Sequence, residues 1–236
     1  MASEPGTSAT QSSSFWRTPW PWAFLLGAVL LVAIRPFQEM MKSAPPPLAQ
    51  PGEWSLIGHQ GTAFSSTDLK GKVWIGNFIF TRCPSICPKL TGSMKKMHQS
   101  LSDLGDQLQF VSFTVDPEFD QPQVLQKYRE KMEIVYPNWT FLTGEKDALH
   151  TLLVKKFFVP VGEKVLLGEK TRSDAGAASV PSDAEQTSQL FDISHSGKLV
   201  LFDQNGDIRA YADATPLGMG SLANAARLLV KQGPNP

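Results

Sequence analysis

Apolar residues follow two different periods along this chain, and the periods alternate from about residue 73 onward. Residues 73–80 (VWIGNFIF) and 108–115 (LQFVSFTV) are nearly continuous apolar runs of strand-forming residues, as expected of strands covered on both faces. Between them, apolar residues recur at helical spacing in a stripe. Its members are Leu90, Met94, Met97, Leu101 and Leu104. The pattern predicts a strand–helix–strand unit.

A second helix is predicted after the second strand. Asp120 is predicted as its N-cap and Gln123 as the partner in a capping box, because these two side chains can bond reciprocally to the start of a helix. Residues 139–142 (WTFL) then predict a short third strand, and residues 146–158 another helix. The polar stretch 161–187, with Gly, Ala and Ser, predicts a long mobile loop.

Hairpins are predicted at both ends of this alternation. One turns at residues 59–61, and the other spans residues 197–212, where Asn205 and Gly206 suit a type I′ turn. Residues 217–231 close the chain with an amphipathic helix. This order of elements predicts an α/β fold, a thioredoxin-like three-layer sandwich with an N-terminal hairpin extension.

The N-terminal part has a different composition. Residues 1–14 are polar and low in complexity, which predicts disorder. Residues 15–37 are long enough to span a bilayer if Arg17 and Arg35 extend toward its two surfaces. A single transmembrane anchor is therefore predicted, with a cleaved signal peptide as the alternative. Residues 38–52 predict a proline-rich linker.

The remainder of the chain, residues 53–236, is predicted to form one domain with its own core. The charge of the whole chain argues against nucleic acid as a partner, because its 22 basic residues balance its 22 acidic ones and no basic stripe is present. Basic residues flank the predicted anchor almost equally, so they do not set its orientation. The N-terminus does not resemble a mitochondrial transit peptide, which favours a bacterial envelope.

The chain has two cysteines, Cys83 and Cys87, in the segment FTRCPSICPKL after the first predicted strand. Each precedes a proline, which disfavours helical conformation, so the helix is predicted to begin at Pro88 with Cys87 as its N-cap. The positive end of the helix dipole would then favour a thiolate at Cys87. Arg82 and Lys89 add positive charge nearby.

The cysteine pair has three interpretations: a structural disulfide, a redox couple or a pair of metal ligands. A disulfide across so short a loop would remove little chain entropy, which argues against a structural bridge. A metal site needs a third donor, and the chain has four histidines, His59, His98, His150 and His195. His98 is predicted to pack in the core, and His59 and His150 to lie on the surface. His195 precedes a predicted strand, which can bring it beside the cysteine loop.

Four stretches together resemble the SCO/SenC family of thioredoxin-fold, copper-binding assembly factors: GNFIFTRCPSICPKLT, VSFTVDPEFDQP, WTFLTG and ISHSGKLVLFDQNG. The resemblance covers nearly all of residues 54–231. It implies that Cys83, Cys87 and His195 are ligands of copper, as Cu(I) or Cu(II). Two thiolates and one imidazole suit Cu(I), and they lack the fourth donor of a structural zinc site.

The resemblance also implies a role and a location. The family's members are membrane-anchored copper metallochaperones that help to assemble the binuclear copper centre of cytochrome c oxidase. The implied partner is the copper-site subunit of that oxidase, with other copper carriers or thiol–disulfide proteins as further partners. The implied location is the bacterial inner (cytoplasmic) membrane, crossed once, with the domain facing the periplasm or the cell exterior.

Other functions remain open at the level of sequence. In one, the protein is an enzyme, a thiol–disulfide reductase whose catalytic redox pair, Cys83 and Cys87, reduces the cysteines of a copper-site target. In another, it is a redox or copper sensor. Asp116 and Asp120 match the family's acidic motif. Helix capping would account for Asp120, and Asp116 is placed to orient a loop beside the site.

Overall fold

The computed structural model describes residues 22–30, 32, 44–84, 86–166, 191–195 and 197–234. The chain divides into two units, Met1–Ser43 and Ala44–Pro236. In the first unit, residues 22–30 and 32 are helical. Within the described ranges, no helix is both long enough and apolar enough to cross a bilayer. The predicted disordered segment 1–14 and both ends of the predicted anchor lie outside the described residues.

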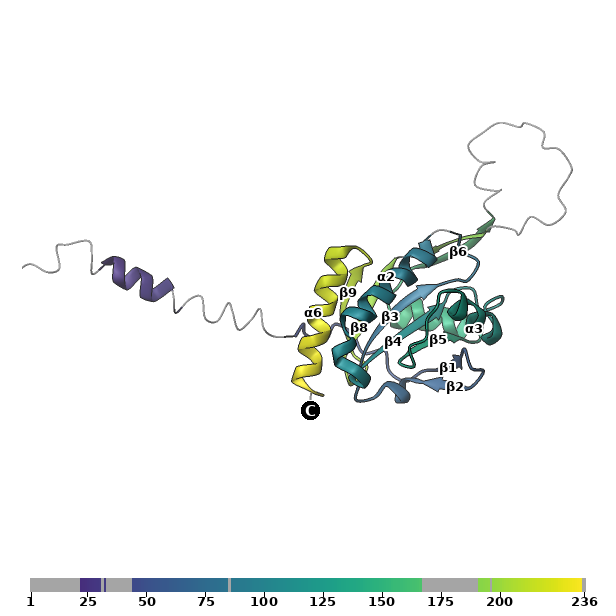
Figure 1. Cartoon of the computed structure of the whole chain (residues 1–236), viewed down its shortest axis with the longest axis horizontal. Helices are drawn as coiled ribbons and strands as arrows, with labels where there is room; N and C mark the ends of the chain where they lie inside the picture. The colour runs from purple at the N-terminus through teal and green to yellow at the C-terminus, as the bar shows by residue number, and fades with distance from the viewer. Residues whose placement is uncertain are drawn as a thin grey trace, which may run out of the picture. The chain divides into compact units, whose positions relative to one another are not determined.

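A seven-stranded sheet forms the centre of the second unit, with the strand order β2-β1-β5-β4-β3-β8-β9 (Figure 1). The strands are β1 (Ser55–Gly58), β2 (Ala63–Ser65), β3 (Val73–Ile79), β4 (Leu108–Thr114), β5 (Trp139–Thr143), β8 (Lys198–Phe202) and β9 (Ile208–Asp213). β3, β4 and β5 run parallel, whereas the pairs β1–β2, β1–β5, β3–β8 and β8–β9 are antiparallel. The predicted strands and both predicted hairpins are confirmed.

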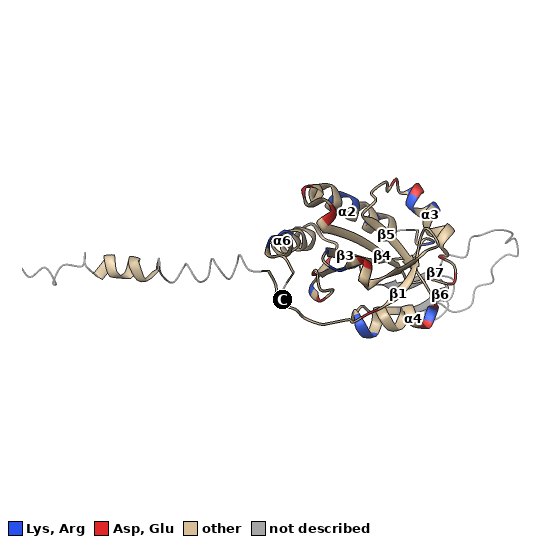
Figure 2. Cartoon of the chain, turned by 90° about the horizontal axis from the view of Figure 1, so that it is seen from below, with Lys and Arg blue, Asp and Glu red and all other residues tan. Residues whose placement is uncertain are grey.

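Helices cover both faces of this sheet, so the predicted three-layer arrangement is confirmed (Figure 2). One face carries α2 (Ile86–Ser100), α3 (Pro122–Lys131) and α6 (Pro216–Gln232). The opposite face carries α4 (Lys146–Thr151), which continues into a π-helical turn, η4 (Leu152–Lys156). Two short 3-10 helices, η2 (Ser66–Leu69) and η3 (Ser102–Gln107), complete the unit. Both hydrophobic clusters lie within Ala44–Pro236, so this unit has its own core and is expected to fold by itself.

The burial of β3 explains its continuous apolar sequence. All seven of its residues are buried, and successive side chains point to opposite faces of the sheet. Ile75 packs under α2 and α6, whereas Trp74 packs on the α4 side and stacks on Phe202 with ring centroids 3.5 Å apart. Most of the predicted helical stripe is confirmed, since Leu90, Met94 and Met97 are buried on α2 and Leu101 is buried just after it. Leu104 lies in η3 and is only partly buried.

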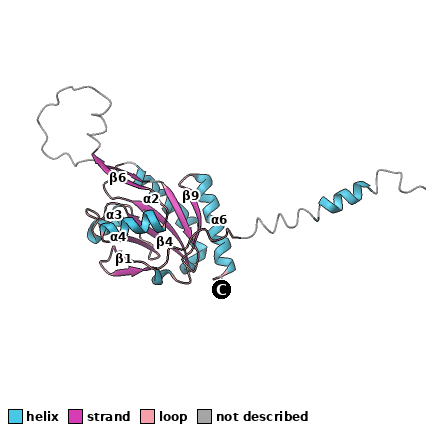
Figure 3. Ribbon diagram, turned by 180° about the vertical axis from the view of Figure 1, so that it is seen from behind, coloured by secondary structure: helices cyan, strands magenta, loops and turns pink. Residues whose placement is uncertain are grey.

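A second, two-stranded sheet pairs β6 (Val161–Leu166) with β7 (Phe191–His195) (Figure 3). The prediction of a loop over residues 161–187 is therefore wrong at its beginning. β6 acquires its backbone hydrogen bonds from a strand far along the chain, and a local sequence pattern does not show such pairing. The rest of the predicted loop lies outside the described residues.

Two predicted helix boundaries are wrong. α3 begins at Pro122 with Gln121 as its N-cap, and no side chain bonds to the helix start. Asp120 is therefore not a cap, because Pro122 occupies the first helical position and its missing N–H needs no acceptor. The helix predicted over residues 146–158 ends at Lys156.

The turn of the β8–β9 hairpin also differs from the prediction. A type I′ turn needs positive φ at both central residues, but only Gly206 has it, at 86°. The Asp203 carboxylate stabilises a different loop, since its Oδ1 accepts hydrogen bonds from the backbone N–H groups of Asn205 and Asp207 at 2.9 and 3.0 Å.

Residues of the predicted linker pack on β9. The Leu48 N–H donates to the Ile208 carbonyl at 2.7 Å, and the Ile208 N–H donates to the Ala49 carbonyl at 2.8 Å. The Arg209 Nε donates to the Pro45 carbonyl at 2.6 Å. The folded unit therefore begins at Ala44 rather than near residue 53. Part of residues 44–52 runs along the edge strand β9 and is hydrogen-bonded to it.

Two glycines should respond in opposite directions to alanine. Gly206 adopts φ +86°, which strains any residue with a Cβ, so Gly206→Ala should destabilise the unit by about 1 kcal/mol. Gly92 lies within α2 with open space where a Cβ would be, so Gly92→Ala should stabilise it by about 0.5–1 kcal/mol. Urea denaturation of both variants measures the free energy of unfolding. A change of the same sign and size in both variants would contradict the strain inferred at Gly206 and the open space at Gly92.

Candidate metal and redox site

The two cysteines are held together at the junction of β3 and α2. The Cys83 N–H donates to the Phe80 carbonyl at 3.2 Å, which turns the chain sharply after β3. The Cys87 N–H donates to the Cys83 Sγ at 3.3 Å, and the Phe80 N–H donates to the Cys87 Sγ at 3.4 Å. Both residues are thiols, with exposed fractions of 7% for Cys83 and 0% for Cys87. Backbone hydrogen bonds thus bring two sulfur atoms to one end of the sheet.

The start of α2 differs from the prediction. The helix begins at Ile86, so Cys87 and Pro88 lie in its first turn and Cys87 is not the N-cap. A proline is tolerated there because the first N–H groups of a helix have no acceptor within the helix. The Cys83 sulfur accepts one of these N–H groups, that of Cys87. Cys83 therefore helps to cap the helix that carries Cys87.

The predicted thiolate at Cys87 is wrong for the metal-free protein. Burial is the main cause that raises the pKa of Cys87, and the neighbouring Cys83 and Asp120 raise it further. The hydrogen bond from the Phe80 N–H lowers it only in part. Cys87 is consequently a protonated thiol at neutral pH, and binding of a cation at this sulfur would release its proton.

A buried carboxylate fixes the chain just before Cys83. Asp120 accepts hydrogen bonds from the Thr81 N–H at 3.0 Å, from the Thr81 hydroxyl at 2.5 Å and from the Thr114 hydroxyl at 2.6 Å. Asp120 is fully buried, and burial raises its pKa. This carboxylate ties the cysteine loop to the end of β4, a role that the capping prediction missed. Pro122 was the signal in the sequence, since a proline at the first helical position moves the cap to Gln121.

A second carboxylate fixes the next residue of the loop. Asp116 is buried, and its Oδ2 accepts a hydrogen bond from the Arg82 Nη2 at 2.5 Å. The Arg82 guanidinium also lies over the Phe119 ring, 4.1 Å from its centroid. Asp116 therefore orients the cysteine loop, as predicted. The Arg82 guanidinium forms an ion pair with this carboxylate.

The sheet topology brings the backbone of His195 to the same end as the cysteines. β8 pairs with β3 in antiparallel register, with Leu199 opposite Asn77, so β8 begins where β3 ends. β7 ends at His195, shortly before β8, and His195 pairs with Val161. The His195 side chain lies outside the described part of the structure. Among the residues that are described, no group of three or more His, Cys, Asp or Glu side chains is arranged to hold a metal ion.

The other histidines have separate environments. His98 is buried, its Nε2 lies 2.7 Å from the Asn138 Oδ1, and its ring stacks on Tyr136, which confirms its place in the core. His150 is exposed, as predicted. His59 is 7% exposed, so its predicted surface position is wrong. Its turn packs against β5, and the Phe141 N–H donates to the His59 Nδ1 at 3.3 Å.

His59 should make the stability of the unit depend on pH. Burial lowers its pKa, and the Arg129 charge lowers it further. The unfolded chain therefore takes up a proton near pH 6.5 that the folded protein does not, so this contribution to stability is present above pH 6.5 and is lost as the pH falls. Between pH 7.5 and 5.5 the loss should be about 1 kcal/mol. Urea denaturation at both values should show a smaller loss in His59→Gln and an unchanged loss in His150→Gln; an unchanged loss in His59→Gln would refute the assignment.

Comparison with known proteins identifies the family. The model of the family described as SCO1/SenC matches residues 43–227. The SCO1 protein homolog of Bacillus subtilis is 40% identical over 105 residues, which are 44% of this chain and 54% of that protein. The chain therefore spans about half the length of this curated relative.

Solved structures agree in fold. The BsSco structure, from the Sco family of cytochrome c oxidase assembly proteins, has a TM-score of 0.59 at 22% identity and covers 80% of this chain and 97% of its own. Yeast Sco1 with copper bound has a TM-score of 0.54 at 25% identity and covers 77% and 90%. The mixed sheet thus matches the thioredoxin-like structures of Sco proteins. The family match extends over most of the folded unit, and the chain belongs to the SCO1/SenC family.

Proposed function

We propose that the folded unit is a copper metallochaperone that binds one copper ion through Cys83, Cys87 and His195. The observation that carries this proposal is the pair of buried thiols, which backbone hydrogen bonds hold close together where the loop after β3 enters α2. The strand that ends at His195 leads toward the same end of the sheet. Copper delivered to the binuclear centre of cytochrome c oxidase is the proposed cargo, and the copper-site subunit of that enzyme is the proposed partner.

The chemistry of the donors supports copper. Thiolates are soft ligands that select Cu(I), and imidazole also suits copper. Burial raises the pKa of Cys87, so without a metal this sulfur carries a proton rather than a buried negative charge. Copper binding replaces the thiol proton, so the loop can be stable both with and without its cargo. The copper-bound structure of yeast Sco1 shows that this fold can hold the metal in a relative.

We also propose that residues 15–37 anchor the protein in a bacterial inner membrane, with the folded unit on the periplasmic or exterior side. The apolar sequence of this segment supports the anchor. The cysteine chemistry is compatible with the oxidising side of such a membrane, where a thiol pair needs either a metal or a reductant to stay reduced.

A thiol–disulfide reductase is the second candidate function. The hydrogen bond from the Cys87 N–H to the Cys83 Sγ favours it, because it holds Cys83, in the loop, close to Cys87 in the first turn of α2. Oxidation of the two thiols would form one disulfide and release two electrons and two protons, which would reduce a disulfide in the target. The reported disulfide switch in BsSco concerns a protein with the same fold.

The two candidates differ in what they require of His195. Anaerobic Cu(I) competition titrations of residues 44–236 should show that His195→Ala lowers the affinity by about 100-fold, whereas the exposed control His150→Ala leaves it unchanged. The rate of disulfide exchange with a small disulfide should change little in either variant. Unchanged copper affinity in His195→Ala, with exchange activity intact, would favour the reductase instead.

A further inference from the structure

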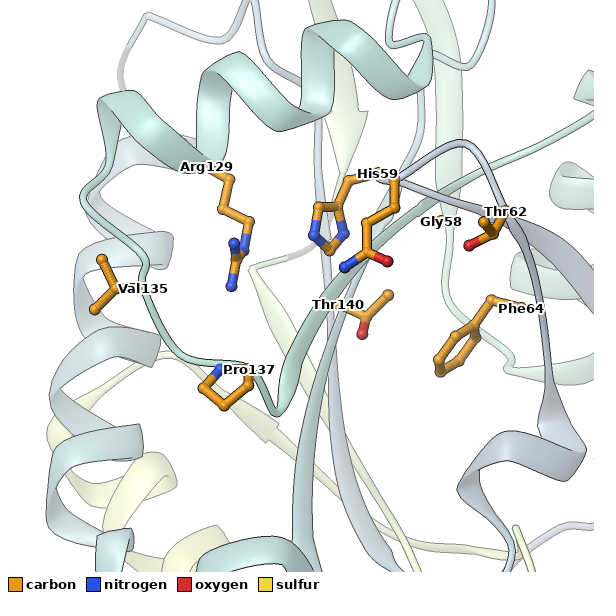
Figure 4. A pocket seen from close by; sticks show the side chains of 9 residues that line it. Gly58, His59, Thr62, Phe64, Arg129, Val135, Pro137 and Thr140 are labelled. Atoms are coloured by element: carbon orange, nitrogen blue, oxygen red, sulfur yellow. The ribbon is translucent and has the colours of Figure 1, made fainter.

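A pocket of about 420 Å³ lies between the β1–β2 turn, the start of β5 and the end of α3 (Figure 4). It lies at the end of the sheet opposite the cysteines, because Thr140 is near the first residue of β5 while the cysteine loop follows the last residue of β3. Its polar lining comes from Arg129, His59, Gln60, Thr62 and Thr140. None of its lining residues is acidic, so a guanidinium faces this pocket without a carboxylate beside it.

Arg129 is only partly satisfied by the protein. Its Nη2 donates to the Tyr136 carbonyl at 2.6 Å, which holds the guanidinium at the pocket wall. Its Nε is buried and has no hydrogen-bond partner within the described ranges. No ion pair with Arg129 is found among the described residues. Burial lowers the pKa of the Arg129 guanidinium. An anion stabilises a guanidinium that is partly removed from water more than it stabilises a fully exposed guanidinium.

His59 adds a donor to the same pocket, and Figure 4 shows its ring beside the Arg129 side chain. Its Nδ1 accepts the hydrogen bond from the Phe141 N–H, so the proton of the neutral ring is on Nε2. The fixed tautomer therefore offers an N–H group rather than a lone pair to a ligand. The Gln60 amide and the Thr140 hydroxyl can donate as well.

We infer that this pocket binds a carboxylate, held by the Arg129 guanidinium and the His59 Nε2–H, from a small organic acid or from the end of a peptide. A planar guanidinium matches the two oxygens of a carboxylate in geometry. Phe64, Val135 and Pro137 form apolar walls that fit a short hydrocarbon segment attached to it. The site is separate from the cysteine loop, so ligand binding does not require copper.

The inference is tested by NMR titration of copper-free residues 44–236 with succinate, N-acetylglycine and N-acetylglycinamide, with ionic strength held by sodium chloride. We expect saturable shifts at the pocket residues with succinate, at a dissociation constant of about 1 mM. Similar binding of N-acetylglycine would add peptide ends to the ligand class, whereas its absence would restrict the class to free acids. The uncharged N-acetylglycinamide should not bind.

Two variants and a control keep this test independent of folding. Arg129→Gln should weaken succinate binding by about tenfold or more, because it removes a charged donor. Thr140→Val removes only a hydroxyl and should weaken binding by about threefold while preserving the fold. Arg227→Gln, on the exposed side of α6, should leave binding unchanged. Absence of saturable shifts with succinate, or equal affinity in wild type and both pocket variants, would overturn the inference.

Discussion

Replacing Cys87 by alanine should lower the Cu(I) affinity of residues 44–236 by more than 100-fold. The loss should exceed the 10- to 100-fold that changes around a metal site usually cost, because a sulfur ligand itself is removed. Cys83→Ala should have a comparable effect. In the double variant no specific site should remain, since both proposed sulfur ligands are gone and the described residues contain no group of three or more His, Cys, Asp or Glu side chains arranged to hold a metal ion. Competition against a Cu(I) chelator under anaerobic conditions measures each affinity.

This expectation needs a control for folding. Cys87 is fully buried, so its replacement removes a small side chain from the core and should cost about 1 kcal/mol of stability. Ser93→Ala, on the same helix, tests the effect of a change in α2 that touches neither sulfur. Urea denaturation should show all variants folded. Retention of wild-type copper affinity by folded Cys87→Ala would remove this residue from the site.

Asp120→Ala should give the second largest effect, on both stability and copper binding. The change leaves three buried or part-buried donors without their acceptor, two on Thr81 and one on Thr114. A donor that loses its partner in the interior costs about 1–3 kcal/mol, and water can satisfy part of this deficit, so we expect about 3 kcal/mol of destabilisation. Because Thr81 positions the cysteine loop, copper affinity should also fall by about tenfold to 100-fold.

The matched control for Asp120 is a nearby exposed acid. Glu118 pairs with Lys146 at 3.2 Å, and both side chains are more than half exposed, so Glu118→Ala should change stability by less than about 1 kcal/mol. Its copper affinity should equal that of the wild type. A similar loss of stability in both variants, measured by urea denaturation, would show that Asp120 has no special role in holding the loop.

The sequence predicted those parts of the fold whose pattern is local. The apolar run of β3 and the stripe on α2 report burial directly, so these elements and the layers around them were predictable. β6 was missed because its partner strand lies beyond a long intervening segment. Asp120 was misassigned for a related reason. The local pattern indicated a helix cap, but the Asp120 carboxylate instead accepts a hydrogen bond from the Thr81 N–H just after β3, and Thr81 is distant in sequence.

The candidate site was predictable in part. The spacing of the two cysteines indicated a reactive loop. The position of His195 before a predicted strand gave only weak support for a third ligand, and it was the resemblance to a family that singled this residue out for the proposed site. The prolines suggested a later helix start and a thiolate, but burial at the start of α2 outweighs the helix dipole and keeps Cys87 protonated. Burial of this kind depends on the packing of α2 and β3 together, which no single segment shows.

The central claim is that one copper ion is held by two cysteine sulfurs and one histidine nitrogen. X-ray absorption spectroscopy at the copper edge, on residues 44–236 loaded anaerobically with one equivalent of Cu(I), tests it most directly. The proposed site predicts two sulfur scatterers and one imidazole nitrogen in the first shell, with the nitrogen lost in His195→Ala. A first shell without sulfur, or one that His195→Ala leaves unchanged, would contradict the proposed ligand set.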